Sequence, residues 1–364
     1  MPRAGLKAIS LALPSHLRTN EYWQRNHPEV VAGAADKILK RIWEQKQSSK
    51  QDPFEAAMAA HLEDPFQGAR ERRWLGPEET VLSLELKAAR QALEAARVSV
   101  NDVDLALVCS FLPDQIGVGN AAFLAQRLEL KCPAWNLETA CTSSLAALQT
   151  ANAFIRSGQF RNVLVIISCA YSRVVDDAST LAFSVGDAAS AMLVGEVPEG
   201  EGLLGFHTIN TAQSCGAMYY EQVQAGGEGV VRMRAGKSAN TAIRAIAIQA
   251  LPECCHGAAQ AAGVSLEEID YFALALPLAW SAQWAPQALG FAPEKIINTH
   301  PLFANIGPAL MPANLFHALH QKRIKQGDLV MMHTVGVVSN ASSGVMRWGN
   351  VAVGPAPEPP THRD

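Results

Sequence analysis

The 364-residue chain lacks the features that mark several protein classes. It has no apolar run long enough to span a bilayer, and its N-terminal stretch shows no A-x-A-like cleavage site. No Lys/Arg tract is interleaved with aromatic residues, and the net charge is only −4, so neither nucleic acid nor a membrane is expected as a partner. The seven cysteines are odd in number and lack zinc-finger spacing. We therefore expect no disulfide framework, no bound metal and a reducing, cytoplasmic location.

The chain is long and apolar enough for a large core. Hydrophobic residues make up 49% of its 364 residues, and a chain of this length is expected to form two fused units rather than one. The charged segment 22–73, which contains "EQKQSSKQD", interrupts the passage from the first strand to the first helix. We interpret it as a helical insertion over the substrate entrance, with a solvated surface excursion as the alternative. The proline-rich tail 353–364 is expected to be flexible or extended.

An internal repeat indicates how the two units are built. Residues 95–110 read "AARVSVNDVDLALVCS" and residues 261–276 read "AAGVSLEEIDYFALAL", with matching small, polar and apolar classes. Each window follows an amphipathic helical segment and ends in a short apolar strand. The repeat divides the chain into an N-terminal half, 1–200, and a C-terminal half, 201–352.

The order of elements predicts the fold class. Strands and helices alternate within each half, which indicates α/β architecture with mixed or mostly parallel sheets covered by helices. Two such halves around buried central helices give a five-layered α-β-α-β-α sandwich. Strands inside it should be apolar on both faces, as "VLVIIS" is.

The stretch "NLETACTSSLAAL" places Cys141 where a helix begins. A cysteine at the first turn of a helix meets the positive end of the helix dipole, which predicts a lowered pKa and a reactive thiolate. The alternative is a small buried packing residue. Cys141 lies 37 positions after Asp104, and Asn305 lies 35 positions after Asp270, so the two occupy similar places in the two halves. If the halves pack about a pseudo-twofold axis, thiol and amide meet in one site.

Longer motifs carry a family resemblance. The segments "ETACTSSLAALQTANAFIRSGQFRNVLVIIS", "FSVGDAASAMLVGE" and "IKQGDLVMMHTVG", together with "RRWLGPEETVLSLELKAARQAL", resemble β-ketoacyl-acyl carrier protein synthase III enzymes of the thiolase superfamily from about residue 72 to 348. The resemblance implies the thiolase fold, Cys141 as the nucleophile and Asn305 as a catalytic amide. It also implies a homodimer in which the strand around "NVLVIIS" pairs with its counterpart. Asp187 of "SVGD" matches a family turn and is expected to be structural.

The sequence departs from the family at two places. Where the family carries its histidine, this chain has Ala275 in "YFALALPLAW"; His300 and His333 are the nearest candidate replacements, each more often structural at such a position. In the family's glycine-rich loop near the C-terminus only Gly336 clearly remains, followed by Val337 and Val338. The backbone N–H groups of this loop are expected to line an oxyanion hole with the N–H of Cys141. Arg72 and Trp74 are candidates for binding coenzyme A or its pantetheine arm; Phe111, Phe183 and Trp280 are weaker pocket candidates.

These observations predict an acyltransferase in fatty-acid-like or polyketide and other natural-product biosynthesis. An acyl group from acyl-coenzyme A or acyl carrier protein would pass through Cys141 to a small-molecule or carrier acceptor. The alternatives are a decarboxylative Claisen-condensing ketosynthase with a relocated histidine and a non-catalytic partner of an active paralogue. The expected thioester, carried by coenzyme A or phosphopantetheine, is a substrate, and no permanently bound cofactor is expected.

Overall fold

The computed structural model describes residues 2–35, 53–237, 239–336 and 340–364. A six-stranded mixed sheet belongs mainly to the N-terminal half and has the order β14-β1-β7-β6-β4-β5. Its strands, in chain order, are β1 (Arg3–Ala12), β4 (Leu105–Phe111), β5 (Ala134–Asn136), β6 (Asn162–Ala170), β7 (Asp187–Val197) and β14 (Ala352–Val353). A four-stranded sheet of the C-terminal half has the order β11-β12-β13-β8, with β8 (Gly202–Asn210), β11 (Tyr271–Leu274), β12 (Leu329–Val335) and β13 (Asn340–Arg347).

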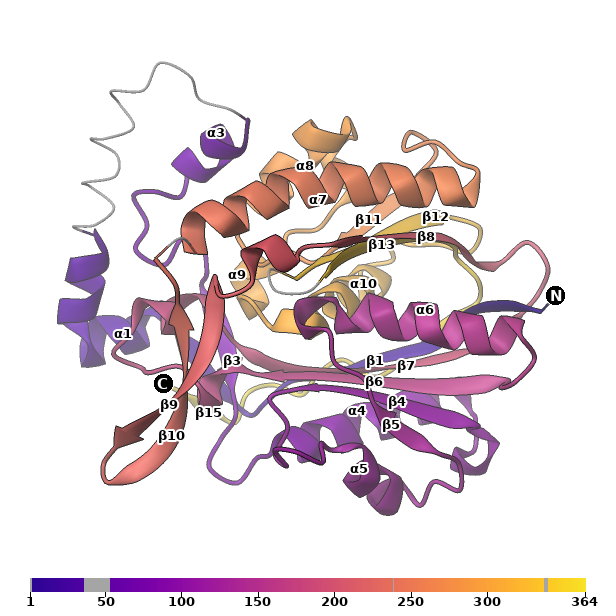
Figure 1. The fold of residues 1–364 in the computed structure, drawn as a ribbon, viewed down its shortest axis with the longest axis horizontal. Coiled ribbons are helices and arrows are strands. Elements are labelled where there is room, and N and C mark those ends of the chain that lie inside the picture. Colours follow the sequence, from indigo (N-terminus) through magenta and orange to yellow (C-terminus); the bar gives the residue numbers. More distant parts are fainter. Residues whose placement is uncertain (1, 36–52, 238, 337–339) are drawn as a thin grey trace.

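Helices cover both faces of both sheets (Figure 1). The central layer holds α6 (Ser143–Arg156) and α10 (Leu310–His320), whose apolar side chains join the two inner sheet faces in the largest core cluster. The outer layers are α4 (Val81–Ala96) with α5 (Ala121–Leu128), and α7 (Ala239–Ala262) with α8 (Ser281–Leu289), each closing a core cluster of its own. The predicted five-layered thiolase-type sandwich is confirmed.

Equivalent hydrogen bonds appear in both halves. The amide of Asp104 donates to the carbonyl of Asn162 at 2.9 Å, and a carboxylate oxygen of Asp104 accepts from the Asn162 amide at 2.9 Å. Asp270 makes the same pair of bonds with Leu329, also at 2.9 Å each. Asn162 and Leu329 begin β6 and β12. The repeated acidic turn therefore fixes the same strand pair in each half.

Two further parts lie at one end of the sandwich (Figure 1). One is the described portion of segment 22–73, with α1 (Asn20–Asn26), α3 (Pro53–Ala59) and β3 (Glu71–Trp74), in which β3 pairs with β2 (His16–Thr19). The other is the antiparallel hairpin of β9 (Met218–Ala225) and β10 (Glu228–Ala235). The tract "EQKQSSKQD" falls outside the described residues. No helix in the described ranges is both long and apolar enough to cross a membrane.

Two expectations about the periphery need correction. The C-terminal tail is extended but not free: β15 (His362–Arg363) pairs with β2, and Arg73 donates to the carbonyl of Glu358 at 2.7 Å. The strand around "NVLVIIS" is β6, which is hydrogen-bonded to β7 on one side and β4 on the other. It is therefore interior and has no edge to offer a second subunit. The short strand β5 forms that end of the sheet.

Candidate active site

A cavity of about 870 Å³ lies beside the starts of the two central helices. Its lining is mostly apolar and comes from both halves, the segment before β3 and the β9–β10 hairpin. The polar side chains that matter for chemistry are Cys141, Tyr171, Asn305 and His333. Apolar walls are supplied by, among others, Phe66, Phe111, Phe183, Met218, Leu251, Leu276 and Trp284. A few convergent polar groups in a large apolar pocket are typical of a ligand site.

Cys141 is held by a tight turn ahead of α6. It lies in the 3₁₀ turn η2 (Ala140–Thr142), and Ala140 before it has φ +54°, a conformation that a non-glycine residue rarely adopts. The Ala140 amide donates to the carboxylate of Glu138, and the Thr139 amide donates to Ser143 Oγ at 2.9 Å. These two bonds stabilise the strained turn, which presents the thiol to the cavity.

Asn305 is presented by the matching turn of the other half. Ala304 before it has φ +53°, and the 3₁₀ turn η7 (Gly307–Ala309) leads on into α10. The Asn305 amide donates to the Ser184 carbonyl at 2.8 Å, and its own carbonyl accepts from Gly186 at 3.0 Å. Gly186 is required here, because a Cβ would lie 2.7 Å from the carbonyl oxygen of Phe303. The "SVGD" motif thus anchors the asparagine.

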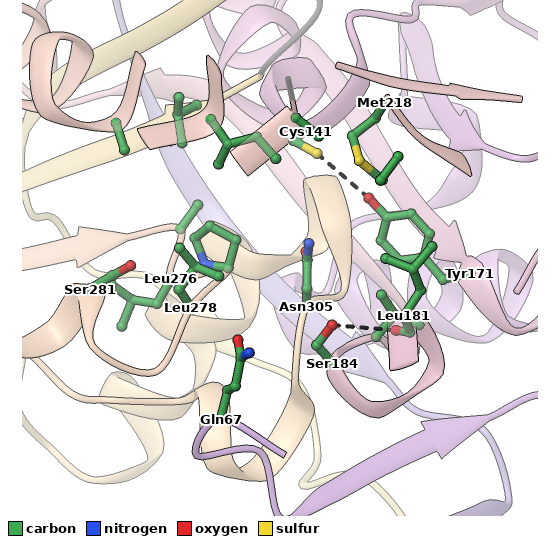
Figure 2. A pocket seen from close by; sticks show the side chains of 18 of the residues that line it. Gln67, Cys141, Tyr171, Leu181, Ser184, Met218, Leu276, Leu278, Ser281 and Asn305 are labelled. Atoms are coloured by element: carbon green, nitrogen blue, oxygen red, sulfur yellow. Dashed lines mark hydrogen bonds between the residues drawn. The ribbon is translucent and has the colours of Figure 1, made fainter. Parts of the chain in front are cut away.

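The side chain of Asn305 is oriented by its own turn. Its Oδ1 accepts a hydrogen bond from the Gly307 amide at 2.9 Å. The other terminal atom of the side-chain amide is therefore the nitrogen, Nδ2. Figure 2 shows that nitrogen directed toward the space that Cys141 and Tyr171 face. The Asn305 amide is therefore placed to donate to an oxygen bound near the thiol.

Tyr171 is a site residue that the sequence reading missed. It begins the turn η3 (Tyr171–Arg173) at the end of β6, and its hydroxyl oxygen lies 3.8 Å from Cys141 Sγ (Figure 2). Burial raises the pKa of Tyr171 well above its usual value. The turn "AYSR" carries no motif that could have indicated this contact.

The predicted lowering of the Cys141 pKa is wrong for this structure. Burial raises the pKa of the thiol, and the hydrogen bond with Tyr171 opposes that rise. The cysteine precedes α6 by two residues, inside a turn walled by apolar side chains. Desolvation in such a site outweighs the dipole effect that the helix start suggested.

Comparisons with known proteins assign the family. A model described as 3-oxoacyl-[acyl-carrier-protein] synthase III matches residues 135–212, and one described as its C-terminal part matches residues 259–348. A β-ketoacyl-[acyl-carrier-protein] synthase III of Sinorhizobium medicae is 30% identical over 331 residues, covering 88% of this chain and 99% of the relative. The chain belongs to the synthase III family.

Solved structures agree on the fold. The synthase III of Thermus thermophilus superposes with a TM-score of 0.77 at 22% identity, covering 95% of this chain and 99% of the other. A Xanthomonas campestris OleA variant with bound lauric acid and lauroyl-CoA gives 0.74 at 18% identity, with 95% and 99% coverage. This synthase III family member therefore shares its fold with these proteins over 95% of its length.

The two candidate histidines are not equivalent in this synthase III family member. His300, in α9 (His300–Phe303), is buried, and its Nδ1 lies 3.3 Å from the Leu276 carbonyl; it is not among the residues that line the cavity. His333 lines the cavity, but its Nδ1 lies 2.9 Å from Ser343 Oγ. Burial lowers the pKa of His300 to about 4 and that of His333 to about 3, so both rings are neutral near pH 7.

His333 faces the outer layer, not the central one. Met331, two residues earlier on β12, packs in the cluster between the sheet and α7, and side chains alternate along a strand. Ser343, the partner of His333, also contacts Cys255 of α7 at 3.4 Å. Ala275, where the family resemblance implies a histidine, lines the cavity, and its amide donates to the His333 carbonyl at 2.9 Å. Among the described lining residues the one histidine is His333, whose Nδ1 lies beside Ser343 Oγ, so the position of Ala275 itself offers no imidazole to the cavity.

The structure gives other predicted site residues packing roles. Arg72 is fully buried and donates from Nε to the Phe183 carbonyl at 2.6 Å, so its guanidinium is not accessible to a coenzyme A phosphate. Trp74 is buried and donates to the Val185 carbonyl at 3.1 Å. Both corrections have one cause: β3 is covered by the aromatic cluster around Trp23. Phe111 and Phe183 do line the cavity, and Trp280 does not.

Gly336 does not offer its amide to an oxyanion. That amide donates to the Asn340 carbonyl at 2.9 Å, and the Gly336 carbonyl accepts from Thr211 Oγ1 at 2.5 Å. The start of β13 therefore occupies the Gly336 amide, and the turn after β8 occupies its carbonyl. Val337 and Val338, the altered part of the loop, lie outside the described residues.

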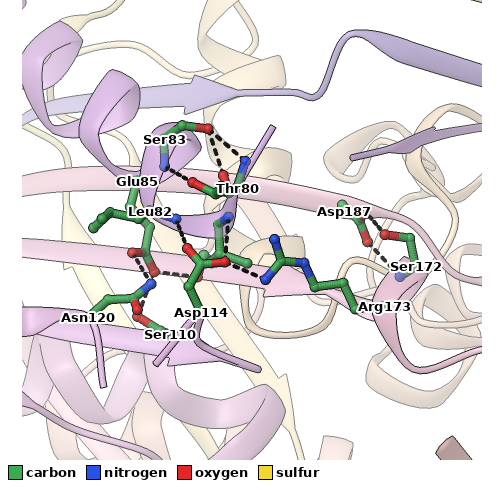
Figure 3. A network of polar contacts seen from close by, with 12 residues as sticks. Thr80, Leu82, Ser83, Glu85, Ser110, Asp114, Asn120, Ser172, Arg173 and Asp187 are labelled. Atoms are coloured by element: carbon green, nitrogen blue, oxygen red, sulfur yellow. Dashed lines mark hydrogen bonds and ion pairs between the residues drawn. The ribbon is translucent and has the colours of Figure 1, made fainter. Parts of the chain in front are cut away.

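A second polar network is formed by residues that do not line the cavity (Figure 3). The buried carboxylate of Asp187 accepts from the Ser172 amide at 2.9 Å and the Leu75 amide at 2.8 Å, which fixes the turn after Tyr171. On the α4 side, Glu85 accepts from Ser110, Ser168 and Asn120. Asp187 is thus structural, as expected, and Glu85 is a fully buried acid that the sequence reading did not single out.

Proposed function

We propose that this synthase III family member is an acyltransferase of the condensing-enzyme type that takes an acyl group from acyl-coenzyme A or acyl carrier protein onto Cys141. The observation that carries the proposal is the convergence of Cys141 and Asn305, from matching strained turns of the two halves, on one apolar cavity. We place it in fatty-acid or polyketide biosynthesis, because the similar curated proteins are β-ketoacyl-[acyl-carrier-protein] synthases and one structural neighbour is the priming β-ketosynthase of the R1128 polyketide pathway.

The first half-reaction needs few groups. Cys141 Sγ attacks the thioester carbonyl carbon, the bond to the carrier sulfur breaks, and the proton of the Cys141 thiol ends on the departing sulfur. The carbonyl oxygen gains negative charge on the way, and the Asn305 nitrogen is a donor on that side of the cavity. No histidine is needed for this step.

The cavity favours a long or bulky acyl chain. Its volume of about 870 Å³ lies toward the upper end of ordinary ligand sites, and its walls are leucine, phenylalanine, methionine and tryptophan. The structurally similar Xanthomonas campestris OleA variant is described with bound lauric acid and lauroyl-CoA. We propose lauroyl-type thioesters as the first substrates to test.

Two other functions remain as outcomes of the test. His333 lines the cavity, which keeps a decarboxylating ketosynthase with a relocated histidine as the second candidate. A non-catalytic partner subunit is the third, and it would not acylate at all. Cys141 and Asn305 in matched positions argue against that role.

Intact-mass measurement after incubation with lauroyl-coenzyme A tests the proposal. We expect one lauroyl adduct on the wild-type protein and none on Cys141→Ser. Cys215 is the matched control, because it is exposed and lines the same cavity; Cys215→Ser should still acylate. An adduct that survives Cys141→Ser, or a wild-type protein that acquires none, contradicts the proposal.

A further inference from the structure

Tyr171 contributes the hydroxyl that lies against the Cys141 sulfur, and the mechanism above leaves it without a role. The O···S distance of 3.8 Å is within the range of a hydrogen bond to sulfur. The side chain is almost fully buried at the wall of the cavity. A buried tyrosine hydroxyl normally has a hydrogen-bond partner, and here the thiol is the partner.

The ring of Tyr171 is closely packed. Phe111 packs edge-on against it, with ring centroids 5.5 Å apart. Gly307 also lies close, because an added Cβ there would lie 3.4 Å from Tyr171 Cε2 and 2.8 Å from Cys169 Sγ. The Tyr171 carbonyl accepts from the amides of Val174 and Val175 at 3.0 and 3.1 Å. The hydroxyl is therefore aimed by packing and by its backbone.

We propose that Tyr171 is a catalytic residue that donates its hydroxyl hydrogen to the Cys141 sulfur and so stabilises the thiolate before acyl transfer. The inference rests on the proposed function for its catalytic meaning, but the contact itself does not depend on any acyl substrate. The tyrosine thus supplies a hydrogen-bond donor beside the nucleophile, in a chain that has Ala275 where the family resemblance implies a histidine.

The chemistry fits a donor better than a base. Once Cys141 has lost its proton, only the phenol has a hydrogen to share. Burial keeps the pKa of Tyr171 well above its usual value, so the phenol stays protonated while the thiol ionises. In the transfer step the tyrosine keeps its own hydrogen throughout. The thiol proton passes to water, the S–C bond forms as the carrier C–S bond breaks, and the departing carrier sulfur takes a proton from water. The tyrosine hydroxyl then lies against the thioester sulfur of the acyl-enzyme.

Other titratable groups also surround the thiol. They are Glu138 on its own turn, Cys169 near the end of β6, Tyr220 on the β9–β10 hairpin, and His333 on β12. The hydroxyl of Tyr220 contacts Met233 Sδ at 3.7 Å, and His333 bonds to Ser343, so neither is committed to Cys141. Within the described structure, Tyr171 is the group whose hydrogen bond lowers the Cys141 pKa most.

The test is the pH dependence of Cys141 alkylation by iodoacetamide in the full-length protein, measured on the Cys141 peptide by mass spectrometry. Tyr171→Phe removes only the hydroxyl. We expect its alkylation midpoint to rise by about one pH unit, with an about tenfold lower rate below the midpoint. Tyr271→Phe is the control, since it deletes a buried hydroxyl bonded to Asn314 outside the cavity and should leave the midpoint unchanged.

The outcomes separate the two proposals. An unchanged or lower midpoint in folded Tyr171→Phe overturns the role of Tyr171, even if Cys141 acylates normally. A raised midpoint in a protein that never acylates leaves the contact intact and refutes the proposed function alone. If Tyr171→Phe does not fold, difluorotyrosine at position 171 provides the second test: the more acidic phenol is a better donor and should lower the midpoint, and a midpoint that does not fall counts against the role.

Discussion

At the scale of single residues, the alanine at position 275 affects acyl transfer and malonyl decarboxylation differently. Transfer of an acyl group to Cys141 needs donors for one oxyanion. Decarboxylation of a malonyl thioester develops an enolate, for which the family resemblance implies a histidine and an asparagine donor together. Here Asn305 is directed at the cavity, Ala275 adds no side-chain donor, and the His333 ring is bonded to Ser343. Removing one such donor costs about 3 kcal/mol, or roughly a hundredfold or more in rate.

We therefore expect the protein to self-acylate readily and to release carbon dioxide from malonyl thioesters slowly. Ala275→His should raise that release if the ring can be aimed, and the radiolabelled carbon dioxide formed per enzyme measures it. His333→Ala and His300→Ala are the matched variants. Turnover of the unmodified protein at about one per second or faster would refute the expectation, and its loss in one histidine variant would identify the substitute.

The residues of the site differ in how far the sequence could predict them. Cys141 and Asn305 follow from the repeat, because similar distances from Asp104 and Asp270, 37 and 35 positions, place them at matching helix starts. Tyr171 could not be predicted in this way, since it meets the thiol across 30 residues through a turn without a motif. Arg72 was misread because a charged side chain in a motif suggests a ligand, while burial depends on distant aromatic residues.

At the scale of elements, Glu85 joins α4 to the underlying sheet through an ionisable group. It is fully buried and accepts from Ser110 on β4, Ser168 on β6 and Asn120 before α5, at 2.6, 2.5 and 2.8 Å. Burial raises its pKa to about 7, against the hydrogen bonds, and the nearby charge of Asp114 adds to the rise. The native state therefore binds this proton more tightly than the unfolded chain does.

Because the pKa of Glu85 is higher in the native state than in the unfolded chain, protonated Glu85 favours the folded state. This contribution to the free energy of unfolding is fully present at pH values below the pKa of the unfolded chain, and it is lost as the pH rises through about 7. We expect the free energy of unfolding to fall by about 3 kcal/mol from this group between about pH 4.5 and pH 7.5. Glu85→Gln should flatten that fall, as measured by urea denaturation at each pH. Asp187, whose pKa burial raises to about 6, acts in the same direction, so the difference between the two proteins is the relevant quantity. Parallel stability curves would rule out the assignment.

At the scale of the whole molecule, the five layers were predictable and the neighbours of each strand were not. Alternating helices and apolar strands, used twice, specify sheets covered on both faces. The family resemblance implies a dimer contact at β6, but β6 is an interior strand. Its apolar run "VLVIIS" fits an interior strand as well as one at a subunit boundary. Strand order depends on long-range packing, which no local pattern records.

The correct sheet order relocates the proposed dimer contact to β5. This strand ends the six-stranded sheet, and Trp135 on it is 42% exposed. The loop before α5 lies alongside, since Asn136 donates to the Val118 carbonyl at 2.8 Å, and it exposes Ile116 by 85% and Val118 by 62%. An unpaired strand edge beside exposed apolar side chains favours association with other chains, and pairing with a second copy would cover both.

We therefore predict a homodimer that pairs through β5 and buries the loop at Ile116. Light scattering at micromolar concentration should give twice the 39.0 kDa chain mass for the wild-type protein. Ile116→Asp should shift it to the monomer without loss of fold, because the side chain has few contacts in the single chain. Ile248→Asp, at a 37% exposed position on α7, is the control and should remain dimeric. A wild-type monomer, or an Ile116→Asp dimer as stable as the wild type, would place the interface elsewhere or remove it.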